Sequence, residues 1–172
     1  DLISYATGVK DVVTLRGALP AGRAQAKSNP ALAALTSMLL DKGTQKQDKF
    51  AITQRLEAVG ASLHFSAGVD TLDISAKCLK KDLPLVLSLM AKQLRMPALD
   101  AEELAKAKKQ LVGGIKRSQE NTDYRAADAF TRLIYPVGHP NRQSDPEALL
   151  AAIESVQPDH VRAFHKAHYG PG

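Results

Sequence analysis

The sequence has one cysteine, no tryptophan and few other aromatic residues. A lone Cys78 excludes a disulfide-stabilised scaffold, because no bridge can form within the chain. No uninterrupted apolar run approaches the roughly 20 residues that a membrane-spanning helix needs. The first residues, Asp1 to Tyr5, lack the basic start of a signal peptide. The sequence also lacks an initiator methionine, so we expect a fragment of a longer protein whose compartment these absences leave open.

What the sequence does contain is typical of one globular domain over residues 1–172. Apolar residues make up 44% and charged residues 24%, with a formal net charge of +5. This length suits a single hydrophobic core. The normal apolar fraction and modest charge argue against a disordered chain.

Positive charge is concentrated between Lys77 and Arg117, a segment that contains ten basic and four acidic residues. Such a block favours a solvated helix face, although nucleic acid, an anionic membrane or an acidic peptide would also suit it. Single strands and RNA are usually bound with aromatic stacking platforms. Because this block has no Phe, Tyr or Trp, we do not expect a nucleic-acid partner.

The first half of the chain predicts a strand, two helices and a hairpin. The β-branched run 12–19 predicts a strand that ends at the turn 20–22. Asn29 and Pro30 predict a helix start, with Leu32, Leu35 and Leu39 buried and an end near Gly43. A second helix is expected from Asp48 to Gly60. Apolar and polar residues then alternate over 61–67 and 71–78, which predicts an antiparallel hairpin.

The second half is predicted to be helical. We expect helices over 82–95, 100–120, 123–134, 145–154 and 158–169, with Asp100 and Glu103 forming a capping box. Strands and helices occur in blocks, which predicts an α+β fold with helices on one face of a largely antiparallel sheet. The final Gly170-Pro171-Gly172 is typical of a turn before another strand. We therefore expect a sheet that has lost its C-terminal strand or shares an edge with a neighbour, for example in a homodimer.

Local chemistry indicates no catalytic site. His165 and His168 share a helix face, but a transition metal needs a third ligand and a second shell, so a metal site is the less favoured interpretation. Cys78 continues an apolar strand face and is predicted to be a small buried hydrophobe. Phosphate-loop, dinucleotide and nucleophile-elbow motifs are absent. Gly113 and Gly114 are unusual within a strong helix, where each costs about 1 kcal/mol relative to alanine.

An ordered series of loose motifs covers nearly the whole chain. Residues 38–44 read Met-Leu-Leu-Asp-Lys-Gly-Thr and residues 56–63 read Leu-Glu-Ala-Val-Gly-Ala-Ser-Leu. The series continues at 70–71, 78–83, 95–100, 135–140 and 161–171. In this order the motifs resemble the pitrilysin/insulinase family of zinc peptidases, the inverzincins. The resemblance implies a processing-peptidase-like metallohydrolase fold.

The resemblance also implies where zinc would bind in a catalytic member. There, H-x-x-E-H supplies two zinc ligands and a base, and a later glutamate is the third ligand. In register with Gly43 and Thr44, these positions hold Ala34, Ser37, Met38 and, near the third ligand, Gly114. None of these residues can replace the family's side chain, so the resemblance implies no catalytic residue and no zinc in this domain.

The resemblance therefore implies a non-catalytic domain of a zinc metalloendopeptidase. Its partners would be a catalytic domain that carries H-x-x-E-H and zinc, and a peptide substrate. The polar face of the hairpin offers candidate substrate contacts at His64, Ser66, Asp73 and Ser75. The alternatives are a scaffold subunit without peptide contact, a separate metalloenzyme that uses His165 and His168, or a basic nucleic-acid binder. Exported bacterial family members favour the periplasm weakly, and the compartment stays open.

Overall fold

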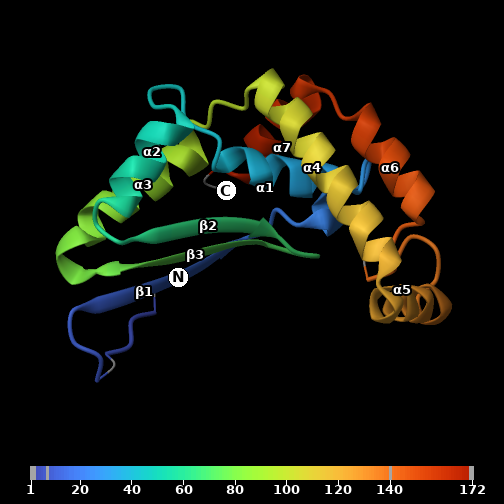
Figure 1. Ribbon diagram of the computed structural model, residues 1–172, viewed down its shortest axis with the longest axis horizontal. Helices are drawn as coiled ribbons and strands as arrows, with labels where there is room; N and C mark the ends of the chain where they lie inside the picture. Colours follow the sequence, from blue (N-terminus) through green and yellow to red (C-terminus); the bar gives the residue numbers. More distant parts are fainter. Residues whose placement is uncertain (1–2, 7, 140, 171–172) are drawn as a thin grey trace.

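A computed structural model describes residues 3–6, 8–139 and 141–170. Figure 1 shows a layer of helices above one face of a sheet, with α5 standing apart at one end. The strands are β1 (Val12–Leu19), β2 (Ser62–Ala67) and β3 (Leu72–Leu79). The helices are α1 (Leu32–Leu40), α2 (Lys49–Glu57), α3 (Leu83–Arg95), α4 (Ala101–Glu120), α5 (Thr122–Ile134), α6 (Pro146–Ser155) and α7 (Pro158–His168). The 3₁₀ turns are η1 (Arg23–Gln25) and η2 (Lys80–Asp82). The predicted α+β class is confirmed.

The sheet of the described residues is antiparallel, in the order β1-β3-β2. The expected hairpin is present, and its register places His64 opposite Ser75 and Ser66 opposite Asp73. The two-residue periodicity turns one side of the hairpin into the core, where the buried residues are Leu63, Phe65, Leu72, Ile74, Ala76 and Cys78. The expected strand after Gly170 lies outside the described residues.

The core lies between the sheet and the helices, with α1 at its centre. Leu35, Leu39 and Leu40 of α1 are almost completely buried and belong to one cluster with the hairpin side chains. The burial that the sequence predicts for Leu32, Leu35 and Leu39 is confirmed. α1 contacts β2, α4 and α7, so this short helix links the sheet to the helical layer.

Helix starts agree with the sequence where an acidic side chain caps them. Asp48, Asp100 and Asp145 each accept hydrogen bonds from backbone N–H groups in the first turn of α2, α4 and α6. These bonds satisfy donors that have no partner within the helix. No helix in the described part of the chain is long and apolar enough to cross a bilayer.

One predicted helix start and one predicted capping box need correction. α1 begins at Leu32 rather than at Pro30, because the Asn29 side chain accepts from the Ala31 N–H at 2.9 Å and closes a turn before the helix. The Asn29 amide also donates to the Ala152 carbonyl on α6 at 2.8 Å.

At α4, Asp100 caps as expected, but the Glu103 carboxylate accepts from Lys49 and Lys106. The Glu103 carboxylate is thus bound by one lysine of its own helix and one of α2, and not by the N–H of Asp100 as the predicted capping box requires.

Candidate functional site

α1 and α4 carry the four positions, Ala34, Ser37, Met38 and Gly114, that the family resemblance aligns with the zinc site of a catalytic member. Ser37 is buried, and its hydroxyl donates to the Ala34 carbonyl at 2.8 Å, so it serves its own helix. Met38 is half-buried and packs against the core cluster. On α4, a side chain added at Gly114 would meet nothing within 4 Å. Open space at Gly114 shows that close packing is not the reason for this glycine.

A cavity of about 310 Å³ opens beside Ala34. Much of its lining is apolar. Small alanine side chains of α1 and β2 line it together with Leu111 and Ile115 of α4. Leu149 of α6 and the loop residues Gln143 and Ser144 close the far side. The remaining lining residues come from the segment before α1, α1 itself, the end of β2 and the turn after it, and α4: Arg23, Pro30, Ala31, Ala33, Ala34, Ala67, Gly68, Val69, Leu111 and Ile115. This cavity can receive an apolar side chain, since it is lined mainly by carbon.

Among the described residues, no group of three or more His, Cys, Asp or Glu side chains is arranged to hold a metal ion. His165 Nε2 donates to the Leu94 carbonyl at 2.8 Å, which commits that nitrogen to the protein. Burial lowers the pKa of His165 and keeps the ring neutral at higher acidity than usual. The His168 ring lies 4.6 Å from the Phe164 ring. The pair on α7 therefore stabilises packing.

The polar hairpin face brings its four predicted residues together. His64, Ser66, Asp73 and Ser75 line one shallow depression of about 550 Å³ with Arg16 of β1. The Thr71 hydroxyl donates to Asp73 Oδ1 at 3.0 Å. With one cation, one carboxylate, an imidazole and two hydroxyls, this surface can hydrogen-bond to a polypeptide backbone or to polar side chains.

Cys78 lies in the core, as its alternation with apolar residues predicts. Burial, with a smaller contribution from Asp82, raises the pKa of the thiol. A raised pKa keeps the sulfur protonated, and a protonated thiol is a poor nucleophile. Cys78 is therefore a packing residue.

Comparison with known proteins identifies the family. Residues 8–140 match the sequence model of the insulinase family, peptidase family M16. The chain belongs to this family. The resemblance drawn from residues 38–44, 56–63 and the later motifs is thereby confirmed.

Two relatives place the chain within the insulinase family. It is 23% identical over 139 residues to an uncharacterised zinc protease of Streptomyces coelicolor, covering 77% of the chain and 28% of that protein. An inactive domain of an M16 peptidase from Pseudomonas fluorescens is 26% identical, with a TM-score of 0.81 over 91% of the chain and 38% of the solved one. The chain thus spans well under half of the length of either relative.

A more distant structure shares the fold alone. The periplasmic protease PqqL of Escherichia coli has a TM-score of 0.79 at 16% identity, over 94% of the chain and 19% of its own. The insulinase-family fold therefore persists where few residues are identical.

The sequence points to positions on α1 and α4 but does not predict the cavity beside Ala34. Ala67 and Gly68 end a strand, and Gln143, Ser144 and Leu149 come from a loop and a helix far along the chain. None belongs to a motif. Only the run of small residues at 31, 33 and 34 gives an indication, since small side chains on one helix leave room beside it.

Proposed function

We propose that residues 1–172 form a non-catalytic domain of a zinc metalloendopeptidase and that this domain packs against a zinc-bearing catalytic domain. The observation that carries the proposal is the replacement of every H-x-x-E-H position on α1. Ala34 has no donor atom, the Ser37 hydroxyl is held by its own helix, and Met38 packs into the core.

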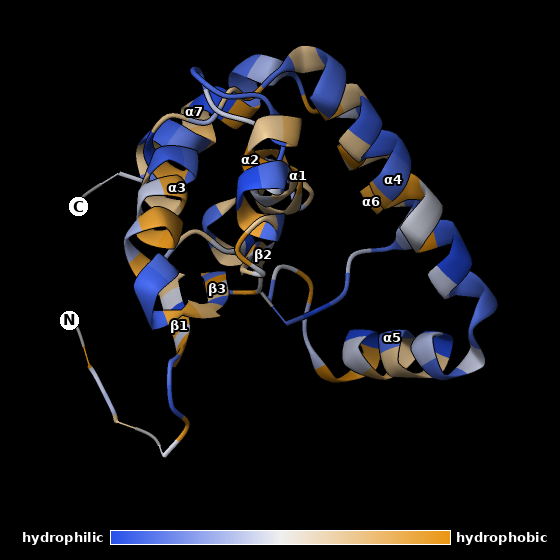
Figure 2. Cartoon of the chain, turned by 60° about the vertical axis from the view of Figure 1, so that its left-hand side comes forward, coloured by the Kyte–Doolittle hydropathy of each residue, from blue (hydrophilic) through white to orange (hydrophobic). Residues whose placement is uncertain are grey.

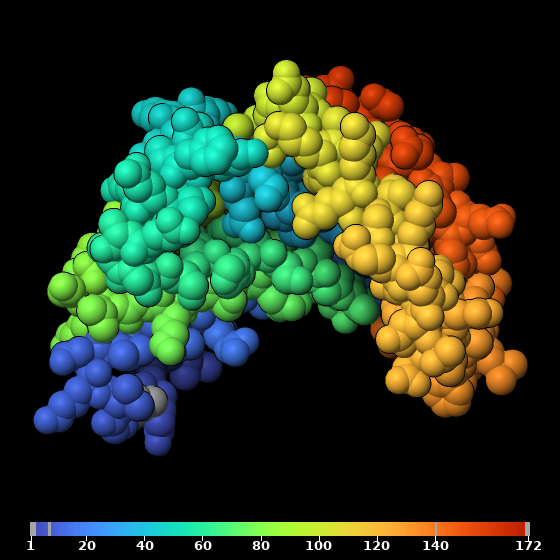
Figure 3. All heavy atoms as spheres, in the orientation of Figure 1, coloured from blue at the N-terminus to red at the C-terminus, as the bar shows by residue number. Residues whose placement is uncertain are grey.

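The contribution of such a domain to peptide cleavage is binding. It completes a peptide chamber together with the catalytic domain. Zinc and the general base belong to that catalytic domain. The hollowed surface between the sheet and α5 supports this role (Figure 3). The Ala34 cavity and the depression around His64 and Asp73 supply apolar and polar contacts to a polypeptide.

Peptide binding by the isolated chain tests this role. We expect weak but measurable affinity for unfolded polypeptides in fluorescence anisotropy, with Asp73→Ala and His64→Ala each reducing it. Asp159→Ala on α7 is the matched control, because Asp159 is exposed and lies outside the depression. A chain that binds no peptide under any condition contradicts the chamber role.

A scaffold subunit without peptide contact is the second candidate. It is favoured by the apolar side chains that α5 exposes, which suit an assembly surface. The peptide measurement separates the two functions, because a scaffold has no affinity for peptide.

A further inference from the structure

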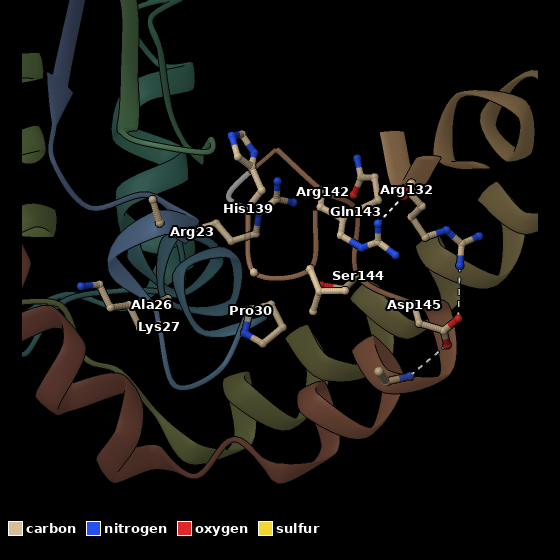
Figure 4. A pocket seen from close by; sticks show the side chains of 14 residues that line it. Arg23, Ala26, Lys27, Pro30, Arg132, His139, Arg142, Gln143, Ser144 and Asp145 are labelled. Atoms are coloured by element: carbon tan, nitrogen blue, oxygen red, sulfur yellow. Dashed lines mark hydrogen bonds and ion pairs between the residues drawn. The ribbon is translucent and has the colours of Figure 1, made fainter. Parts of the chain in front are cut away.

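A second cavity, of about 590 Å³, adjoins the Ala34 cavity (Figure 4). Its lining residues come from the segment 23–30 and from the later segments 132–139 and 142–148. The two cavities share four lining residues, Arg23, Pro30, Gln143 and Ser144. The shared residues place the two cavities side by side, within reach of one short peptide segment.

The second cavity is cationic. Its lining contains Arg23, Lys27, Arg132 and Arg142 against the single carboxylate of Asp145. Asp145 is already engaged, because it caps α6 and accepts from Arg132 at 3.2 Å. No ion pair of Lys27 or Arg142 occurs among the described residues, so the cavity keeps an excess of positive charge.

Two of the arginines are held in place by the protein. Arg142 donates to the Tyr135 carbonyl at 2.7 Å and to the Arg132 carbonyl, which are neutral acceptors. These bonds orient the Arg142 guanidinium without neutralising its charge. Arg132 pairs with Asp128 at 2.6 Å. In Figure 4 the Arg23 side chain extends from the blue segment toward the loop that carries His139.

An apolar cavity beside a cationic one matches a particular peptide chemistry. A bulky apolar side chain fits the Ala34 cavity, and a carboxylate forms charge-assisted bonds with guanidinium groups. In an extended peptide, residues i and i+2 point to the same side about 7 Å apart. Neighbouring cavities therefore suit side chains two positions apart.

We propose that the two cavities bind an extended acidic peptide segment, with a large apolar residue at Ala34 and an Asp or Glu two positions away at Arg23 and Arg142. The inference rests on the proposed peptide-binding function and names its substrate class. Charge complementarity selects the acidic side chain. A single-stranded nucleic acid is disfavoured because the described lining of the two cavities contains no Phe, Tyr or Trp, and its one ring, His139, is already stacked on Tyr135.

The test measures the affinity of the folded chain for short dye-labelled peptides with both ends blocked. The peptides share one sequence except for a central Leu-Ser-Glu, Leu-Ser-Gln or Ser-Ser-Glu. We expect Leu-Ser-Glu to bind at least about tenfold more tightly than either of the others. Its advantage over Leu-Ser-Gln shrinks as salt is added, because exposed charge pairs are screened.

Paired variants locate the binding. Ala34→Phe fills the apolar cavity and Arg23→Gln removes a cation, and each is expected to weaken Leu-Ser-Glu at least about fivefold. Ala151→Phe and Arg95→Gln are the matched controls, because both positions are exposed and line neither cavity. Thermal unfolding verifies that each variant is folded. Lys27→Gln removes an exposed cation of the same cavity and is a second charge variant.

The outcomes separate this inference from the proposed function. Equal binding of Leu-Ser-Glu and Leu-Ser-Gln overturns the acidic preference but leaves peptide binding intact. Equal losses from Arg23→Gln and Arg95→Gln also overturn it, because the attraction is then nonspecific charge. If none of the three peptides binds, the inference fails. The proposed function fails as well only if the chain also has no affinity for unfolded polypeptides.

Discussion

Two glycines have opposite surroundings, and each tells what its position needs. Gly114 lies on α4 with open space around an added methyl group. At Gly22 the same methyl group would come within 2.5 Å of the backbone of Asp70 and Thr71. Gly22 also donates to the Asp70 carbonyl at 3.1 Å. Gly22 is thus required by a close approach of two chain segments, whereas Gly114 is not required by packing.

We expect Gly114→Ala to stabilise the fold by about 0.5–1 kcal/mol, because alanine loses less entropy than glycine in a helix. Gly22→Ala should destabilise it by about 1–3 kcal/mol, since backbone atoms must move. Urea unfolding of both variants measures the difference. A loss of stability in Gly114→Ala would show that the position has a packing partner after all.

Glu103 connects α2 and α4 through two lysines, Lys49 at 2.9 Å and Lys106 at 2.8 Å. The bonds from Lys106 and Lys49 lower the pKa of Glu103 to about 2. A carboxyl whose pKa is lowered on folding contributes its stability above its unfolded pKa, and loses it as the pH falls toward the folded value.

The stability difference between wild type and Glu103→Gln should therefore be constant near neutral pH. It should shrink between about pH 5 and pH 2. Denaturant unfolding across this range checks the expectation. Glu102→Gln is the control, because no ion pair of Glu102 occurs among the described residues. A stability difference that does not change with pH would mean that Lys49 and Lys106 do not stabilise the ionised form of Glu103.

At the scale of elements, α5 differs from an ordinary surface helix, because its large apolar side chains are exposed and its one buried side chain is charged. Its buried side is polar, with Asp128 bonded to Arg132 at 2.6 Å. Its exposed side carries large apolar residues, namely Phe130 at 61% exposure, Leu133 at 85% and Ile134 at 53%. Figure 2 shows α5 projecting from the other helices. Apolar side chains in contact with water gain nothing from folding, so they do not hold α5 in place.

We expect Leu133→Glu to change stability by less than about 0.5 kcal/mol, because the residue is exposed. Leu35→Ala, in the core of α1, should cost about 2–5 kcal/mol. Leu133→Glu should also reduce self-association in light scattering, since exposed apolar patches promote it. A large loss of stability at Leu133 would mean that α5 packs through this face.

At the scale of the whole molecule, α1 packs against α4, the pair of helices that the family resemblance aligns with the zinc ligands of a catalytic member. The two helices are in contact, although Ala34 and Gly114 are far apart in the sequence. We expect the fourfold variant Ala34→His, Ser37→Glu, Met38→His and Gly114→Glu to bind one zinc ion. The wild-type chain should retain far less than one after dialysis.

Elemental analysis of both proteins measures zinc, and the same variant without Gly114→Glu should bind it more weakly. If the fourfold variant gains no zinc, the register inferred from Gly43 and Thr44 is wrong. If the wild type retains zinc that replacing His165 or His168 releases, the metal site lies on α7.

The sequence by itself determined the elements that depend on near neighbours. Alternation over 61–67 and 71–78 predicted the hairpin and its buried face, because a strand has only two sides. Acidic residues at 48, 100 and 145 predicted helix starts, since capping is local chemistry. The motifs at 38–44 and 56–63 predicted the family, because a motif is a pattern of residues that are close in the sequence.

Only the tertiary structure decided what depends on distant partners. Asn29 bonds to α6 and Glu103 bonds to α2, and neither contact has a sequence pattern. The exposed apolar side of α5 has the same helical periodicity as a buried one, so periodicity could not tell which way it faces. The paired cavities arise where the segment before α1 meets the loop before α6, with the end of β2 and residues within α4 lining the smaller of the two. Cavity shape is a property of long-range packing, and the order of residues does not encode it locally.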